Sequence, residues 1–163
     1  TIILICSNED NLLSTIKSRC TRMHFEPLKE NEIKQYLENV IPEQQISENI
    51  INLAQGSIGK AIKLNEKKDI YENIEKILIS MRKNDLIEIV QMSEGIYKSK
   101  EEINSILEYI NVLLLKLSKQ NMKYIKCIEI VEETKKRLKA NSNYDMCIDY
   151  MIFSMWQEII EHR

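Results

Sequence analysis

Glycine and proline are scarce in this sequence, with three and two copies among 163 residues. Glycine frees the backbone and proline removes an amide hydrogen, so each of them interrupts regular helices. Isoleucine, leucine, lysine, glutamate and asparagine are abundant instead. This composition predicts a mainly α protein.

Long apolar runs and a strong net charge are also missing. No stretch approaches the length of a membrane span and no signal-peptide pattern is present, so we expect no membrane partner. The formal net charge is -2. A value so close to neutrality gives no indication of a nucleic-acid-binding surface on the molecule as a whole.

The four cysteines lack the spacing of a metal site. Cys6, Cys20, Cys127 and Cys147 form no Cys-x-x-Cys pair, and the two histidines lie far from them in the sequence. We therefore expect no zinc site and no other metal site. Because each cysteine has apolar neighbours, we interpret all four as reduced, buried side chains of a cytoplasmic protein.

The first residues have the pattern of a buried strand. Thr1–Cys6 are apolar and rich in isoleucine, and Ser7 and Asn8 close the run. Such a strand needs neighbours for its backbone hydrogen bonds, yet no other segment resembles a central strand. We therefore expect residues 1–26 to be the C-terminal remnant of a longer α/β domain, with one strand and a short helix over Glu9–Ser18. In isolation this part should be poorly supported, or held by a neighbouring chain.

Residues 27–66 are predicted to form a small helical module. Ser47 and Ser57 are suitable N-caps, and Gly56 stands where a helix C-terminus favours glycine. Apolar residues at spacings of three and four then define three short helices. These helices are expected over residues 30–41, 48–55 and 58–64.

Residues 67–163 are predicted to form an antiparallel helical bundle. Asn84-Asp85, the capping-box pattern Ser99–Glu102 and Asn141–Asn143 mark expected helix starts. An apolar surplus at Ile152, Phe153 and Trp156 lies off the main stripe of the last helix, which would suit a subunit interface. The apolar stripes place helices over residues 70–81, 86–96, 103–117, 125–138 and 144–159.

Ser18-Arg19-Cys20 directly follow the first short helix. The order of an apolar strand, Ser7-Asn8, a Leu-Leu-x-Thr-Ile helix and Ser-Arg-Cys resembles the end of the ATPase module in clamp-loader subunits of the AAA-plus superfamily. The resemblance implies that Arg19 is an arginine finger, reaching in trans to ATP on a neighbouring subunit, with Ser18 and Cys20 as motif neighbours. It also implies that Ser7 and Asn8 hold the sensor-1 position. A guanidinium offers a rigid, permanently charged fork for a γ-phosphate. The alternative is that Arg19 only counters the dipole at a helix end.

The segment Gly56–Ala61 is not a phosphate-binding P-loop. Only two residues separate its glycines, and an alanine follows Lys60. By resemblance it corresponds to the sensor-2 segment of the same family, where many relatives have an arginine at the position of Lys60. Lysine lacks the guanidinium fork, so a nucleotide-sensing role and a solvated lysine are both open. Gly-Ser-Ile-Gly-Lys-Ala is most similar to the delta prime type of bacterial clamp-loader subunit.

The resemblance implies three domains and a function. Residues 1–26 would be the remnant of the ATPase domain, residues 27–66 the lid, and residues 67–163 the collar. The collar would bind the gamma or tau and delta subunits, and the assembled ring would load a sliding clamp on primer-template DNA. No Walker A or Walker B pattern occurs, so we expect no ATP hydrolysis by this chain and no cofactor beyond ATP on the neighbour. The alternatives are an active gamma- or tau-type ATPase with its P-loop upstream, and a helical protein-interaction module.

Overall fold

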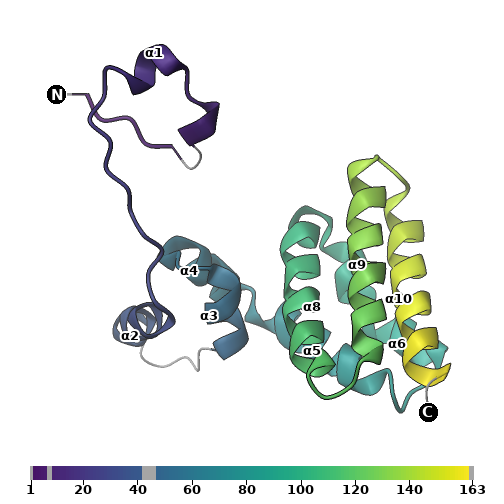
Figure 1. Ribbon diagram of the computed structural model, residues 1–163. Helices are drawn as coiled ribbons and strands as arrows, with labels where there is room; N and C mark the ends of the chain where they lie inside the picture. The colour runs from purple at the N-terminus through teal and green to yellow at the C-terminus, as the bar shows by residue number, and fades with distance from the viewer. Residues whose placement is uncertain (1, 7–8, 42–46, 162–163) are drawn as a thin grey trace.

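The protein is mainly helical and has three parts along the chain. The computed structural model describes residues 2–6, 9–41 and 47–161. An N-terminal segment stands apart from the rest and is joined to it by an extended stretch (Figure 1). Next come α2–α4, which we call the module, and then α5–α10, which we call the bundle. Among the described residues no strand is formed.

The N-terminal segment contains two short helical turns. η1 (Glu9–Asn11) is a 3₁₀ turn, and α1 (Ser14–Lys17) is one turn of α-helix. Between them Leu13 has an extended backbone, with φ −59° and ψ 141°. The predicted continuous helix over residues 9–18 is therefore wrong. Leu13 is exposed, and a short helix with no surface for its apolar face is not stable in water.

The predicted strand over Thr1–Cys6 is also not formed in its described part, residues 2–6. Ile2 and Ile5 are 90% and 95% exposed. A single strand has no partner for its N–H and C=O groups, and burial of an isoleucine needs a surface to pack against. The apolar pattern predicts a covered segment, and the described residues provide no cover. Thr1, Ser7 and Asn8 lie outside the described residues.

The module forms as its sequence pattern predicts. α2 (Glu30–Val40), α3 (Glu48–Ala54) and α4 (Ile58–Glu66) match the three expected helices within two residues. The Ser47 hydroxyl accepts from Asn49 N–H at 3.3 Å, and the Ser57 hydroxyl accepts from Lys60 N–H at 3.2 Å. Both predicted N-caps are thus confirmed, because each satisfies a donor that the helix itself leaves free.

Gly56 joins the module to the extended stretch that precedes it. Its φ is +84°, and its carbonyl accepts from Leu28 N–H at 3.1 Å. A Cβ at this position would lie 2.3 Å from Pro27 Cβ. Only glycine permits both this backbone angle and this close approach. The turn between α3 and α4 therefore fixes the point at which the chain enters the module.

The bundle has three long helices and a layer of shorter ones (Figure 1). α9 (Lys123–Lys139) packs between α8 (Ile103–Ser118) and α10 (Tyr144–Glu161). The shorter elements precede them in the chain. They are α5 (Lys68–Ser80), α6 (Leu86–Met92), α7 (Glu94–Lys98) and the 3₁₀ turn η2 (Lys100–Glu102).

Two details of the bundle differ from the sequence prediction. The helix expected over residues 86–96 is divided at Ser93, whose buried hydroxyl donates to Ile89 O at 2.8 Å beside its own backbone N–H, which donates to the same carbonyl at 3.0 Å. The capping box at Ser99 is not formed, and the Ser99 hydroxyl donates back to Gly95 O at 2.8 Å. Glu102 pairs with Lys67 instead. By contrast, Asp85 caps α6 and Asn143 caps α10 as expected.

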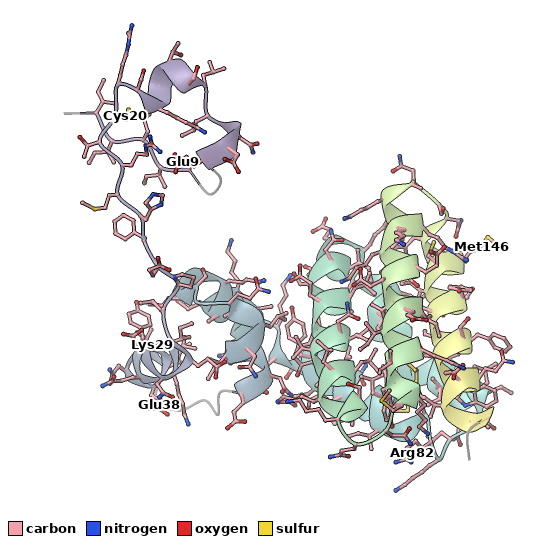
Figure 2. All side chains as sticks on the ribbon, in the orientation of Figure 1. Glu9, Cys20, Lys29, Glu38, Arg82 and Met146 are labelled. Carbon is pink, nitrogen blue, oxygen red and sulfur yellow. The ribbon has the colours of Figure 1, made fainter. Side chains whose placement is uncertain are left out.

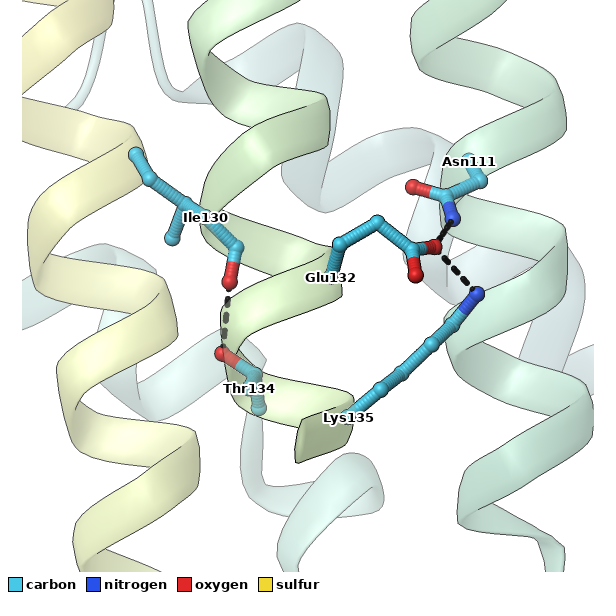
Figure 3. Close-up of polar contacts among 5 residues, drawn as sticks. All are labelled: Asn111, Ile130, Glu132, Thr134 and Lys135. Carbon is cyan, nitrogen blue, oxygen red and sulfur yellow. Dashed lines mark hydrogen bonds and ion pairs between the residues drawn. The ribbon is translucent and has the colours of Figure 1, made fainter. Parts of the chain in front are cut away.

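A continuous core and polar side-chain contacts between helices hold the bundle together. On the surface between α8 and α9, the Glu132 carboxylate accepts from Asn111 at 2.6 Å and from Lys135 at 2.7 Å (Figure 3). Within α9 the Thr134 hydroxyl donates to Ile130 O at 2.9 Å, which satisfies a buried group (Figure 3). Fully buried core side chains include Ile74, Ile89, Ile106, Leu107, Leu114, Val131, Ile148 and Met155.

We expect Gly56→Ala to destabilise the protein by about 1 to 3 kcal/mol, because alanine disfavours a positive φ and its methyl group would collide with Pro27. Gly59→Ala is the matched control. Nothing lies within 4 Å of a Cβ at Gly59, and alanine is favoured over glycine in a helix by up to about 1 kcal/mol. Urea unfolding should thus give midpoints that move in opposite directions. Equal midpoints would contradict the role assigned to Gly56.

Candidate functional site

Arg19 lies just beyond the C-terminal end of α1, at the tip of the N-terminal segment. Its backbone N–H donates to Ile16 O at 3.1 Å. The Ser18 hydroxyl donates to Thr15 O at 3.2 Å, and Ser18 N–H donates to Ser14 O at 3.0 Å. Local hydrogen bonds therefore fix the backbone of the motif on the last turn of α1. The Arg19 side chain itself is exposed.

A second arginine closes the loop that carries the motif. Arg22 Nη1 lies 2.6 Å from Glu9 Oε1, and His24 Nε2 lies 3.8 Å from the other carboxylate oxygen. This contact joins the extended stretch after the motif to η1, thirteen residues earlier. Because it is solvent-exposed, the ion pair contributes only modestly to stability, and its main effect is geometric. Figure 2 shows Glu9 and Cys20 in the same compact N-terminal segment.

Arg19 differs from Arg22 in having no carboxylate partner within the described part of the chain. The alternative role for Arg19, countering the dipole of α1, gives little reason to place an arginine here. α1 has four residues, and a helix dipole is the sum of its aligned peptide dipoles. Arg19 thus presents an unpaired guanidinium to solvent, with all its donors available to an external anion.

The other members of the predicted site have mixed positions. Cys20 is exposed beside Arg19, and Cys6 is exposed as well. Our interpretation of all four cysteines as buried is therefore wrong for these two, whose apolar neighbours in sequence are themselves uncovered. Cys127 and Cys147 are buried in the bundle as expected. Ser7 and Asn8 lie outside the described residues.

Lys60 lies at the start of α4, in the module, and not beside Arg19. Its Nζ is 3.2 Å from Glu108 Oε2 on α8, and the two side chains are 34% and 46% exposed. Figure 1 shows α1 and α4 well apart. The structure therefore does not bring Lys60 and Arg19 to one site, and the Lys60 ammonium contacts the bundle.

The basic residues of α9 are largely used inside the bundle. Lys126 lies 3.0 Å from Glu158, and Arg137 lies 3.1 Å from Glu133 and stacks 3.8 Å above the Tyr150 ring. Lys123 is buried, and its Nζ donates to Ile159 O at 3.0 Å near the end of α10. Because these three side chains already have partners in the bundle, they are less available to contact a phosphate backbone.

Of the three apolar residues that lie off the main stripe of α10, only one is largely exposed. Ile152 is buried, and the Trp156 indole donates to Asn84 O at 3.1 Å within the bundle. Phe153 is 49% exposed. Two of the three side chains expected at a subunit interface thus contribute to the fold of this chain, and Phe153 faces outward.

Metal binding and membrane insertion receive no support from the described residues. Within residues 2–6, 9–41 and 47–161, no three His, Cys, Asp or Glu side chains gather in a way that could hold an ion. In the same ranges, no helix combines the length and apolarity that crossing a bilayer requires.

A polar cluster at the junction of module and bundle was missed by the sequence analysis. The Glu75 carboxylate on α5 accepts from Asn49 Nδ2 at 2.6 Å and from the Tyr109 hydroxyl on α8. Burial and the hydrogen bond to Glu75 raise the pKa of Tyr109. Lys116 on α8 donates to the Asn49 side-chain oxygen. The four residues lie on three helices and belong to no motif, and the polar start of α3, Glu48-Asn49, gave no specific sign of the cluster.

Comparisons of the chain with protein-family models, with curated proteins and with solved structures found no match. The functional argument accordingly depends on the residues themselves and on where the structure puts them.

Alkylation should separate the two pairs of cysteines. Burial raises the pKa of Cys127 to about 12, so its thiol stays protonated at pH 8, and the reagent cannot reach it. We expect iodoacetamide at pH 8 to modify Cys6 and Cys20 in the native protein, and Cys127 only after denaturation. Mass spectrometry of peptides taken over a time course measures each rate. Modification of Cys127 as fast as Cys20 would show that the bundle core is open.

Proposed function

We propose that this chain is a clamp-loader subunit of the delta prime type, which presents Arg19 to ATP bound by a neighbouring subunit. In this proposal the N-terminal segment ends an AAA-plus ATPase domain, the module is the lid, and the bundle is the collar that joins the loader ring. The ring would open a sliding clamp and place it on primer-template DNA. The chain itself would not hydrolyse ATP.

The observation that carries the proposal is the exposed, unpaired Arg19 in a Ser-Arg-Cys motif whose backbone is fixed. An arginine that acts in trans must be ordered at its Cα and free at its guanidinium. Ser18 and the Arg19 N–H supply the order through α1, and the Glu9–Arg22 contact closes the loop. The neighbouring arginine is paired and Arg19 is not, which supports a role for Arg19 outside this chain.

The chemistry of phosphoryl transfer explains why such a residue would matter. Negative charge moves onto the bridging and equatorial oxygens as the bond to the γ-phosphate breaks. A guanidinium is planar and permanently charged, and it can donate two parallel hydrogen bonds to those oxygens. Supplied by a neighbour, it would make ATP turnover depend on assembly of the ring.

Exposed apolar side chains around the motif support a contact with further protein. Ile3, Met23 and Phe25 are uncovered in the described segment. Isolated exposed apolar residues are common, but a concentration of them in one small segment indicates a surface that is normally covered. A subunit boundary beside Arg19 would provide such cover.

The test is ATP turnover by a complex reconstituted from this subunit with gamma or tau and delta partners, a sliding clamp and primed DNA. We expect Arg19→Ala to reduce stimulated turnover at least about tenfold while the complex still assembles. Arg19→Lys should also be slow, because lysine keeps the charge and loses the fork. Lys17→Ala, which removes a neighbouring cation of α1, is the matched control and should behave as the native protein.

The outcomes distinguish the candidate functions. Unchanged turnover with Arg19→Ala in an intact complex would overturn the arginine-finger role. If the native protein forms no complex with these partners, the clamp-loader assignment fails. The chain is then better studied as a helical interaction module.

A further inference from the structure

The contact between module and bundle has an unusual polar centre. α3 packs on α8, and Figure 1 shows α3 and α4 on the side of the module that faces the bundle. Most of this contact is apolar, and Ile50, Leu53 and Leu107 are buried. The hydrophobic effect is itself non-directional, so hydrogen bonds add directional restraint to the shape matching of the packed helices. Directional contacts are therefore informative here.

Asn49 provides such a directional contact from the module side. Its NH2 group donates to the Glu75 carboxylate on α5, with 2.6 Å between Nδ2 and Oε1. Its side-chain oxygen accepts from the Lys116 ammonium on α8. The amide therefore lies between an anion and a cation, with its positive end toward Glu75 and its negative end toward Lys116. Rotating the amide by a half turn would lose both contacts.

Of the two charged partners, Glu75 is held in place by the bundle. The Glu75 carboxylate also accepts from the Tyr109 hydroxyl, and the Tyr109 side chain is 1% exposed and packs at 4.7 Å against the Tyr71 ring. Glu75 is itself half-buried. Hydrogen bonds to charged groups are stronger than neutral ones, and partial burial protects them from water. Contacts within the bundle thus hold the Glu75 carboxylate in place.

Asn49 is equally well held on its own side. It lies in the first turn of α3, where the Ser47 hydroxyl caps its backbone N–H. A displacement of the module would move the amide away from the Glu75 carboxylate on α5 and the Lys116 ammonium on α8. Lys60 and Glu108 also join module and bundle, as an ion pair. Because both side chains are partly exposed, this pair contributes little to stability.

We propose that the Asn49 amide, seated between Glu75 and Lys116, is a latch that fixes the orientation of the module on the bundle. We call these three residues the Asn49 latch. Breaking it leaves the two bodies folded and in apolar contact, and it allows the module to adopt several orientations. This inference does not depend on the clamp-loader proposal.

The test measures the distance between module and bundle in the whole protein. Spin labels are attached through ketone-bearing amino acids at Glu38 on α2 and Met146 on α10, so the native cysteines stay in place. Both positions are exposed and lie on the two bodies (Figure 2). Pulsed electron–electron double resonance then gives the distribution of distances between the two labels, and circular dichroism verifies the helix content.

We expect one narrow distribution in the native protein. Asn49→Ala and Lys116→Ala should each broaden it at least about twofold, because the module gains alternative orientations. The matched controls are Asn52→Ala on α3 and Lys119→Ala at the end of α8, which change the same residue types outside the latch and should leave the width native. A fifth change, Tyr109→Phe, removes only the hydroxyl that holds Glu75 and should broaden the distribution by a smaller amount.

Native width in Asn49→Ala, with native helix content, would overturn the proposal. Equal broadening by Asn49→Ala and Asn52→Ala would also overturn it, because the effect would then belong to α3 as a whole. If Asn49→Ala does not fold, Lys116→Ala decides the question, since Lys116 is exposed and its loss leaves no buried group unpaired.

Discussion

The burial of α8 is the constraint on which the rest of this structure depends. Its apolar residues face α9 along most of the helix, and they also meet α5 and, from the module, α3. Ile106, Leu107 and Leu114 are fully buried, so one helix supplies the centre of the bundle and the floor on which the module rests. Because burial of large apolar side chains is the main favourable term in folding, the helices that contact α8 are ordered with it. In its described residues the N-terminal segment has no buried side chain, and polar contacts such as Arg22 with Glu9 close its loop.

The accuracy of the sequence analysis follows the range of the interactions involved. Helix starts at Ser47, Ser57 and Asp85 were predicted correctly because a cap is decided within four residues. The strand over residues 1–6 and the helix over residues 9–18 were predicted from apolar patterns that need a packing partner, and in the described residues none is present. Ser99 shows a third cause of error. A suitable capping residue is present, but its hydroxyl donates to Gly95 O and makes no cap hydrogen bond.

The candidate site divides along the same line. The exposure of Arg19 follows from its place after a short helix, and the sequence motif located it. The pairing of Arg22 with Glu9, and of Lys60 with Glu108, joins residues 13 and 48 positions apart, which no local pattern encodes. Those pairings are informative for function, because they show which cations this chain uses itself. Of the two arginines in its segment, Arg19 is the one without a carboxylate partner in the described structure.

The close approach of Pro27 to Gly56 makes the stretch between Arg19 and Leu28 a tether of defined length. Arg19 and its anchor Leu28 are nine positions apart in the sequence, so the Arg19 Cα can reach at most about 30 Å from the module. A charge on such a tether samples a limited volume, and its effective concentration there is of the order of millimolar. For an anion held within this radius by a docked partner, the effective concentration of Arg19 depends on the length of the tether. It does not depend on the amount of protein in solution.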